Sequence, residues 1–521
     1  MPIWDMLAER TRKTPDARAV VDGGLELSWA GFFERASRLG QGLRSLGIRP
    51  GDRVAVIGWN SHRFLEAYFA TAGIGAILNP LNLRESSAAL AAILGDSGST
   101  LVLADAEFVP TILEARRLGA PVRTLVVGGG AASPAEDGVA RVAWDALLAA
   151  SPSTLDDPHP TGASTVAHLY FTSGTTGRAK GVMLTHGNVE SHARAAVAEL
   201  GLSSSDTWGH IAPLFHLADA WATFAMTIAG GTHWCVPRFD PVPVLDALST
   251  NVTITNLVPV MLNALVKDPT IEGRRFPKLR RILSGGAPIA PTLVRRIMDV
   301  FGAEYVNTYG MTETSPYLTL SLPTPDVLRL SSDEQFVYRA MTGRPFLGVD
   351  LRVVRSDGTE TARDGVEVGE IVVRGPTVTP GYWERPDLTE AAFVDGWLKT
   401  GDLAVRERRG WINIVDRAKD MIITGGEKVY STEVEAAAWS HPAVLEAACF
   451  GRPSETWGEE VVLAVVPRPG CDLRVDDLLD HLRQRLSSWK VPKAVVPLDA
   501  LPKTGSGKIS KQRLRESWGK A

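Results

Sequence analysis

Apolar and polar positions in the first half of the chain alternate between a strand-like and a helix-like pattern. Short apolar runs predict strands at residues 54–57, 101–103, 125–127 and 166–171. Segments with helical spacing of apolar residues predict helices at residues 64–76 and 109–118. Strands and helices that alternate in this way are typical of α/β domains with mainly parallel sheets.

The second half of the chain has a different pattern. Short β-type runs at residues 349–355, 369–374 and 410–415 predict a β-rich subdomain over about residues 343–415. Helix, strand and helix patterns then follow at residues 432–440, 460–466 and 475–486, which is typical of a small α+β unit. We therefore expect an α/β fold. Its large N-terminal domain of layered sheets should span residues 1–417, and its small C-terminal domain residues 418–521.

Composition narrows the class of protein. A formal net charge of -4, with 45% hydrophobic and 22% charged residues, indicates a globular protein and gives no electrostatic reason to expect nucleic acid as a partner. Two uncharged stretches, residues 67–83 and 220–237, contain Asn, Gly or His, so we expect buried helix-plus-strand segments rather than transmembrane spans. The three cysteines are too scattered for a disulfide framework or a metal cluster, and the first residues lack the apolar core of a secretory signal. We expect a cytoplasmic protein.

The strongest chemical motif is residues 170–181. It combines hydroxyl residues and glycines with one lysine, Lys180. The hydroxyl residues and glycines are Thr172, Ser173, Gly174, Thr175, Thr176, Gly177 and Gly181. Glycines let backbone N–H groups approach a phosphate closely, hydroxyls add donors, and a lysine adds positive charge. The motif is not a Walker A loop, because Gly177 and Lys180 are not adjacent and no Ser or Thr follows the lysine. Composition alone also suits a surface loop, so the interpretation depends on the motifs that follow.

This loop resembles that of the adenylate-forming (ANL) superfamily, which includes acyl-CoA synthetases, peptide-synthetase adenylation domains and luciferases. Further segments match the family in its own order: residues 284–289, 307–314, 400–403, 416–422, 424–429 and 502–509. The resemblance implies that ATP or AMP is bound by Thr172, Ser173, Gly174, Thr175, Thr176, Gly177, Lys180, Gly286, Ala287, Pro288, Asn307, Tyr309, Gly310, Asp402 and Arg417. Ala179 stands where the family usually has proline, a change that removes no phosphate ligand.

The resemblance also implies roles in the reaction. Thr312 would contact the α-phosphate, Glu313 would bind Mg²⁺, and Lys508 would be the mobile catalytic lysine on a glycine-rich loop. A hard cation usually takes one or two protein carboxylates together with phosphates and water, so a single Glu suits it. Tyr309 would stack on adenine, and Asp402 would accept both ribose hydroxyls. Residues 381–383 match a structural motif of the family, to which we assign no chemistry.

In the small domain, the resemblance implies mobility. Lys419 occupies the hinge position, and Gly425, Gly426 and Glu427 would line the passage of coenzyme A (CoA). Many relatives have asparagine at the position of Lys428, so side-chain contacts in this passage differ.

The acyl pocket of the family corresponds to His216, Leu217, Trp221, Pro259, Gly310 and Met311. His216 would lie at the acyl group, near the carboxylate. Members that activate amino acids have an aspartate at this position, which pairs with the substrate amine. That aspartate is absent here, although Asp219 lies three residues further on. We therefore expect an unaminated apolar acid: fatty, aromatic or arylalkanoic.

Together these motifs predict an acid–thiol ligase, an AMP-forming carboxylic acid:CoA ligase, with Mg²⁺ as cofactor and ATP and CoA as cosubstrates. The predicted partners are a small-molecule carboxylic acid, ATP and CoA, with no nucleic acid; the oligomeric state stays open, a homodimer included. One alternative is an acyl-AMP ligase that loads the phosphopantetheine of a carrier protein. A luciferase-like oxygenase and a non-catalytic nucleotide-binding regulator are the others, and the intact charged positions disfavour the regulator.

Overall fold

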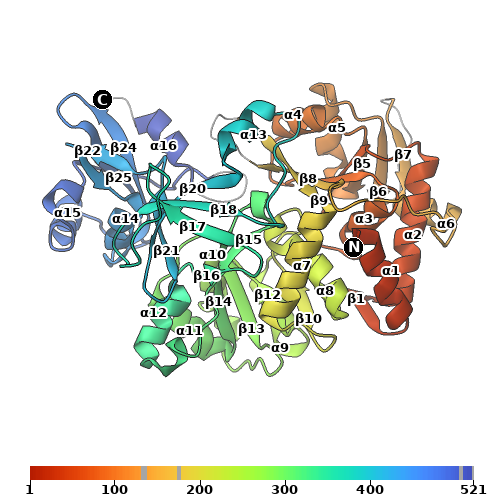
Figure 1. The fold of residues 1–521 in the computed structure, drawn as a ribbon, viewed down its shortest axis with the longest axis horizontal. Coiled ribbons are helices and arrows are strands. Elements are labelled where there is room, and N and C mark those ends of the chain that lie inside the picture. The colour runs from red at the N-terminus through yellow and green to blue at the C-terminus, as the bar shows by residue number, and fades with distance from the viewer. Residues whose placement is uncertain (131–137, 173–177, 504–508, 519–521) are drawn as a thin grey trace. The chain divides into compact units, whose positions relative to one another are not determined.

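Two large sheets organise the first part of the chain in a computed structural model that describes residues 1–130, 138–172, 178–503 and 509–518 (Figure 1). The chain divides into two units: the first holds Met1–Leu351 and Val373–Leu398, and the second holds Arg352–Val372 and Lys399–Ala521. The division places residues 399–417 in the second unit, so the predicted domain boundary after residue 417 stays a prediction.

The larger sheet has nine strands and carries most of the candidate site. Its order is β16 (Arg344–Pro345), β15 (Tyr317–Leu320), β14 (Glu304–Gly310), β13 (Arg281–Gly285), β12 (Ile254–Asn256), β10 (Thr207–His210), β11 (Thr232–Cys235), β1 (Arg18–Asp22) and β2 (Leu25–Ser28). Pairing from β14 across to β1 is parallel, and the outer pairs are antiparallel. The carboxyl ends of β12, β13 and β14 therefore meet at one edge, where ligands of open α/β sheets bind.

The second sheet of the first unit has seven strands. Its order is β7 (Ala140–Ala143), β6 (Thr124–Gly128), β5 (Leu101–Asp105), β3 (Arg53–Ile57), β4 (Ile77–Pro80), β8 (Val166–Thr172) and β9 (Lys180–Thr185). Only the β8–β9 pair is antiparallel. The mainly parallel α/β fold predicted from the alternating pattern is confirmed.

Helices join these strands and cover the sheets. The first unit contains α1 (Ile3–Lys13), α2 (Trp29–Ser45), α3 (His62–Gly73), α4 (Ser87–Ser97), α5 (Val109–Arg117), α6 (Trp144–Ala150), α7 (His186–Leu200), α8 (Leu217–Ala229), α9 (Pro241–Thr250), α10 (Pro259–Leu265), α11 (Pro291–Phe301), α12 (Ser332–Ala340) and α13 (Pro386–Ala392). Helix α11 shows why such segments form. A proline begins it, Gly302 ends it with a left-handed φ of 64°, and Val294, Ile297 and Phe301 share its buried face.

A smaller sheet contains β17 (Asp350–Val354), β18 (Gly369–Arg374), β20 (Trp397–Arg406), β19 (Phe393–Val394) and β21 (Ile412–Arg417). The strands match the predicted β-type runs, and the division between the two units falls within β17, β18 and β20.

The second unit is built on an antiparallel core. Its elements are β22 (Ile422–Thr424), β23 (Glu427–Val429), α14 (Ser431–Trp439), β24 (Val444–Ser454), β25 (Gly458–Pro467), α15 (Val475–Arg483), β26 (Ala494–Pro497) and α16 (Lys511–Trp518). Alternate residues of β24 and β25 enter two different cores, as the period of two in a strand requires. One core contains Val434 of α14 and Leu478 of α15, and the other contains Leu514 of α16.

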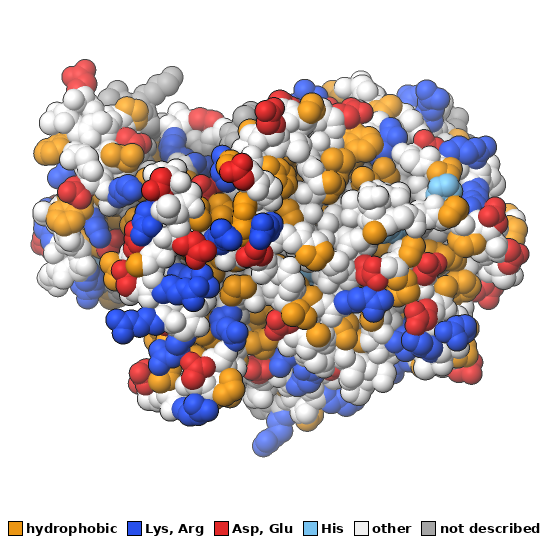
Figure 2. Space-filling view, viewed as in Figure 1, with side chains coloured by type: hydrophobic (Ala, Val, Ile, Leu, Met, Phe, Trp, Pro, Cys, Tyr) orange, Lys and Arg blue, Asp and Glu red, His pale blue; other side chains and the backbone are white. Residues whose placement is uncertain are grey.

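The prediction about the uncharged stretches agrees with the structure. Within the described residues, no helix combines the length and the apolar character needed to cross a bilayer. Residues 67–83 lie mostly in α3 and β4, and residues 220–237 in α8 and β11, all of them buried elements. On the face shown in Figure 2, basic and acidic side chains are interspersed, as a formal net charge of -4 allows.

Candidate active site

Three side chains from distant parts of the first unit meet beside the phosphate-loop motif. Lys180 Nζ lies 2.8 Å from Glu313 Oε1 and 2.6 Å from the Tyr382 hydroxyl. The Tyr382 hydroxyl lies 2.9 Å from the same Glu313 oxygen. Glu313 is only 3% exposed. Two of the three residues were predicted to act on ATP and Mg²⁺, and the structure brings them together with a tyrosine that was given no chemistry.

Backbone hydrogen bonds place Tyr382 in this cluster. Val182 of β9 and Tyr382 form an antiparallel bridge, flanked by bonds from Met183 N to Gly381 O (3.1 Å) and from Trp383 N to Gly181 O (2.8 Å). Glycine is required at position 381, because its φ is 145° and a Cβ there would lie 2.6 Å from Thr389 Cγ2.

Glu313 is held separately, in the short helix η3 (Thr312–Thr314) after β14. Its backbone carbonyl accepts a hydrogen bond from Thr379 N at 2.8 Å, which ties η3 to the segment that carries Tyr382. The same segment therefore contacts both the backbone and the carboxylate of Glu313.

Electrostatics fix the hydrogen-bond directions in the cluster. Burial, and then the Glu313 carboxylate, raise the pKa of Tyr382 above its ordinary value, so its hydroxyl stays protonated. The hydroxyl donates to Glu313 and accepts from the Lys180 ammonium, which also lies 4.1 Å from the centre of the tyrosine ring.

The phosphate-loop motif begins and ends on paired strands. Thr172 at the end of β8 pairs with Lys180 at the start of β9. The predicted ligands between them, Ser173, Gly174, Thr175, Thr176 and Gly177, lie outside the described residues, as does Lys508. Their assignments therefore stay predictions from the resemblance.

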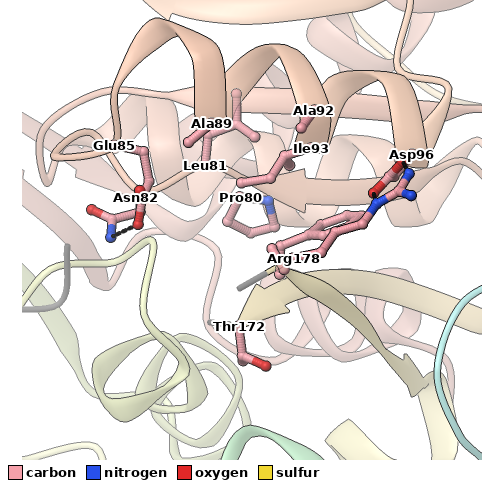
Figure 3. Close-up of a pocket in the computed structure, with 12 residues that line it drawn as sticks. Pro80, Leu81, Asn82, Glu85, Ala89, Ala92, Ile93, Asp96, Thr172 and Arg178 are labelled. Atoms are coloured by element: carbon pink, nitrogen blue, oxygen red, sulfur yellow. Dashed lines mark hydrogen bonds and ion pairs between the residues drawn. The ribbon is translucent and has the colours of Figure 1, made fainter. Parts of the chain in front are cut away.

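A cavity of about 430 Å³ lies beside the stems of this loop (Figure 3). Its lining is mainly apolar, with Pro80, Leu81 and Ile93 among its residues. At one end Asn82 donates to Glu85 at 3.3 Å, and at the other Arg178 forms an ion pair with Asp96. The ion pair connects α4 to Arg178, which follows the predicted phosphate ligands and lies two residues before β9.

The predicted adenine segments meet at the carboxyl edge of the larger sheet. Gly285 of β13 pairs with Thr308 of β14, and a Cβ at Gly285 would lie 2.4 Å from the Thr308 hydroxyl, so only glycine permits this approach. Gly286, Ala287, Pro288 and Gly310 are exposed there, and Tyr309, Met311 and Thr312 are half-buried. An exposed strip next to a tyrosine is suited to a planar base.

The side chain of Asn307, which was also predicted to bind the nucleotide, is hydrogen-bonded to the end of a neighbouring helix. Its side-chain amide donates to the carbonyls of Met341 (3.0 Å) and Ala340 (3.3 Å), at the end of α12. These bonds give Asn307 a role in holding β14 against α12.

The predicted ribose and hinge residues belong to the second unit. Asp402 of β20 and Arg417 of β21 are cross-strand partners, with Arg417 Nε 3.2 Å from Asp402 Oδ1. Lys419 follows in an exposed turn, where its carbonyl accepts a hydrogen bond from Arg515 at 3.3 Å. The two side chains are paired with each other, and their roles at the nucleotide stay predictions.

The predicted CoA-passage residues form a tight hairpin in the same unit. Gly425 and Gly426 connect β22 to β23 with φ values of 58° and 84°, as a two-residue turn of type I′ requires, and Glu427 is exposed. Gly425 N also donates to Trp457 O at 2.8 Å. Position 425 needs glycine for its backbone conformation, so its presence does not depend on CoA binding alone.

Two residues predicted for the acyl pocket, Trp221 and Gly310, lie at a cluster of aromatic rings. Trp221 of α8 lies 5.0 Å from Tyr317 and 5.4 Å from His192 of α7, measured between ring centroids, and all three are buried. Tyr317 is the cross-strand partner of Gly310. His216 ends the loop before α8 and packs against Phe215, while Leu217 begins the helix and Pro259 begins α10. The structure therefore joins the α8 and β14 parts of the predicted pocket.

Asp219 is excluded as an amine-binding residue by its surroundings. It is 0% exposed, and its two oxygens are bonded to Trp208 Nε1 (3.1 Å) and His210 Nδ1 (2.6 Å). Burial raises its pKa, against the opposing effect of His210. Asp219 therefore faces the core, and the preference for an unaminated acid no longer depends on sequence position alone.

Comparison with known proteins agrees with this geometry. Residues 7–383 match the family model for AMP-binding enzymes, and residues 433–508 match the model for the AMP-binding enzyme C-terminal domain. The chain belongs to the AMP-binding enzyme family. It is 38% identical over 512 residues to a feruloyl-CoA synthase from an Amycolatopsis species, with 98% of each chain covered. It is 34% identical over 527 residues to a long-chain-fatty-acid–CoA ligase from Thermus thermophilus, covering 99% of this chain and 95% of that protein.

Solved structures of this AMP-binding family share the fold. The o-succinylbenzoate CoA synthetase of Bacillus subtilis, bound to its acyl-adenylate intermediate, superposes with a TM-score of 0.85 at 30% identity, covering 99% of this chain and 98% of that one. The same enzyme is known with ATP and a magnesium ion, with a TM-score of 0.84. The predicted recognition and enzyme class are confirmed: the chain is an acid–thiol ligase of the AMP-forming acyl-CoA synthetase class.

Sequence reasoning missed several residues of the site in this AMP-binding enzyme. Tyr382 was identified as part of a structural motif, but its contact with Glu313 joins positions 69 residues apart. His192 carried no motif of its own, whereas Tyr317 ends a segment, residues 310–317, that was expected to build the acyl pocket. The sequence signal that could have indicated Tyr382 is its place between Gly381 and Trp383 in the family motif. In the structure this segment forms a bridge to β9, the strand that begins with Lys180.

Proposed function

We propose that this ligase activates a compact aromatic acid, of the aryl or arylalkenoic type, as its acyl-adenylate and transfers the acyl group to CoA. The observation that supports the acid class is the buried ring cluster of His192, Trp221 and Tyr317 beside Gly310. Aromatic rings pack favourably against other rings, whereas a long alkyl chain would need an open channel through them. The feruloyl-CoA synthase relative, at 38% identity, supports the same class.

The reaction runs in two steps. An oxygen of the acid's carboxylate attacks the α-phosphorus of ATP, and pyrophosphate leaves, so that the acyl carbon becomes part of a mixed anhydride with AMP. The sulfur of CoA then attacks the acyl carbon, and AMP leaves. Neither step requires a protein nucleophile, so the protein contributes positioning and charge neutralisation.

Lys180 is suited to neutralise phosphate charge, because its ammonium lies at the stem of the phosphate-loop motif. The second-unit residues Asp402 and Arg417 are proposed to bind the ribose and phosphate, as the family resemblance implies. Lys508 is proposed to neutralise the α-phosphate during adenylation only.

Mg²⁺ fits the donor chemistry around Glu313. Among the described residues, no group of three or more His, Cys, Asp or Glu side chains could hold a metal by itself. A single carboxylate together with nucleotide phosphates is the usual protein contribution to a Mg²⁺ site. Glu313 would hold the ion, which when bound supplies charge neutralisation at the phosphates.

An acid panel tests the proposed substrate class. AMP release would be measured with and without CoA for cinnamate- and benzoate-type acids, for saturated acids of increasing length, and for an α-amino acid. We expect kcat/KM for the best aromatic acid to exceed that for a long-chain acid by about 100-fold, the range that pocket shape supplies. A long-chain acid that is the better substrate would refute the assignment.

A matched pair of variants tests whether the ring cluster sets the acid size. Trp221→Leu should raise relative activity on longer acids. Trp144→Leu removes another buried tryptophan, on α6, and should lower stability without changing the preference. An equal preference change in both variants would show that the effect is general loosening of the fold.

The acyl acceptor is tested in the same assay. A carrier-protein ligase would form its thioester on a phosphopantetheinylated carrier protein and not on free CoA. We expect AMP release with the best acid to be accelerated by CoA and unaffected by the carrier protein.

A further inference from the structure

We propose that Tyr382 is a positioning residue that holds the Glu313 carboxylate in place for the metal ion that accompanies ATP. The proposal rests on the assignment of Mg²⁺ to Glu313 and goes beyond it, because Tyr382 lies in a segment to which no chemistry was assigned. Its hydroxyl is 2.9 Å from Glu313 Oε1 and 2.6 Å from Lys180 Nζ.

The geometry distinguishes the roles of the two partners of Glu313. Both contact the same oxygen, Oε1, so neither of them occupies Oε2. A carboxylate with one oxygen fixed cannot rotate freely, and its second oxygen keeps a defined direction. Hydrogen bonds of this kind to ligating carboxylates commonly orient metal ligands in proteins.

Lys180 alone could not hold Glu313 during the reaction. Its ammonium is proposed to neutralise phosphate charge, and a lysine that turns towards a phosphate gives up part of its contact with Glu313. Tyr382 has no such second task here, because its hydroxyl carries a single proton and donates it to Glu313. The tyrosine therefore keeps Glu313 oriented when ATP draws Lys180 away.

The main-chain hydrogen bonds of Tyr382 and its neighbours suit this role. The bridge to Val182 and the flanking backbone bonds fix its main chain against β9, the strand that begins with Lys180. The backbone N–H of Tyr382 is also fixed, because it donates to Thr389 Oγ1 at 3.0 Å. The side chain that carries the hydroxyl therefore extends from a main chain that is hydrogen-bonded on both sides.

Tyr382→Phe tests the proposal, because it removes the hydroxyl and keeps the ring that packs against Lys180. Mn²⁺ replaces Mg²⁺ as an electron paramagnetic resonance probe, titrated into the enzyme with an unreactive ATP analogue. We expect the Mn²⁺ affinity to fall by about 10-fold or more, the usual effect of losing a hydrogen bond that orients a metal ligand. Pyrophosphate exchange should need a correspondingly higher metal concentration for half-saturation.

Two further variants make the outcome decisive. Tyr305→Phe removes the hydroxyl of another buried tyrosine, on β14, and should leave the Mn²⁺ affinity unchanged. Glu313→Gln should weaken Mn²⁺ binding more than Tyr382→Phe does. If Glu313→Gln weakens binding and Tyr382→Phe does not, the positioning role is wrong while the metal assignment stands. If Glu313→Gln has no effect, the metal assignment itself fails.

Discussion

Asp219 offers a test of whether a buried carboxylate near the proposed acyl pocket serves the substrate or the core. Its oxygens are bonded to Trp208 Nε1 at 3.1 Å and to His210 Nδ1 at 2.6 Å. His210 Nε2 lies 3.0 Å from His233 Nδ1, and His233 Nε2 lies 3.3 Å from Thr227 Oγ1. All of these side chains are 0% exposed.

The direction of each bond in this chain follows from its last member. The Thr227 hydroxyl donates to Thr223 O at 2.7 Å, so it accepts from His233 Nε2–H. His233 Nδ1 then accepts from His210 Nε2–H. One remaining proton lies between His210 Nδ1 and Asp219, and the pair has no net charge whichever atom carries it.

This proton count predicts losses of stability of different size for two substitutions. In Asp219→Asn, the amide oxygen can accept from Trp208 and one amide N–H can donate to a neutral His210, so both bonds are retained. Only the second amide N–H is left without a partner, at a cost of about 1–3 kcal/mol. Asp219→Ala leaves the buried donor of Trp208 and a ring nitrogen of His210 without partners. At about 1–3 kcal/mol for each, the expected loss is about 2–6 kcal/mol.

Urea unfolding followed by far-ultraviolet circular dichroism measures the stability of both variants against the unchanged enzyme. The acid panel, including an α-amino acid, measures selectivity in parallel. We expect neither variant to alter discrimination against the amine. A loss in Asp219→Asn as large as that in Asp219→Ala would refute the proton count, and gain or loss of amino-acid activation would return Asp219 to the substrate site.

Three further predictions concern the reaction cycle and acid stability. Lys508→Ala should lower acid-dependent pyrophosphate exchange by about 100-fold or more, because a charge contact at the phosphate is lost, and should spare thioester formation from supplied acyl-AMP; equal damage to both would indicate a structural role. Lys419→Pro should retain exchange and lower thioester formation, since proline fixes φ at about -65° at the predicted hinge. Normal thioester formation would remove Lys419 from that role. Burial lowers the pKa of His168 and His192 to about 3 and that of His186 to about 4, so the unfolded chain binds more protons below its own pKa of 6.5. The stability these residues provide is complete above that pH and declines as pH falls towards the folded values, by about 2 kcal/mol for each residue at about pH 5. Urea midpoints that do not change between about pH 7.5 and pH 5 would contradict this.

Much of the fold could be predicted because the local patterns are consistent with the tertiary structure. The run at residues 101–103 and the helical spacing at 109–118 correspond to β5 (Leu101–Asp105) and α5 (Val109–Arg117). Their differences from the prediction are confined to element ends, where side-chain periodicity says little and capping decides. The turn at Gly425 and Gly426 is also the kind that sequence can predict, because two adjacent glycines suit a hairpin that requires positive φ.

The site was predictable only as far as motifs reach. Lys180 and Glu313 could be assigned separately, but their ion pair joins residues 133 apart, and no local pattern indicates such a contact. Tyr382 was missed for the same reason. The burial of Asp219 was also beyond sequence reasoning, since an aspartate in the first turn of a helix is ordinarily a favourable exposed residue.

The buried network also explains how the proposed acyl pocket would keep its shape. Asp219 and Thr227 lie eight positions apart on α8 and therefore share one face of the helix, where both contact the His210–His233 pair. A rotation of α8 by one residue would bury the carboxylate without partners, at a cost of several kcal/mol. The polar face therefore fixes the rotation of a helix that is apolar elsewhere. Trp221 lies on a different face, so the same constraint determines where its ring meets Tyr317. In the proposed acyl pocket, a buried polar network therefore fixes the position of one wall.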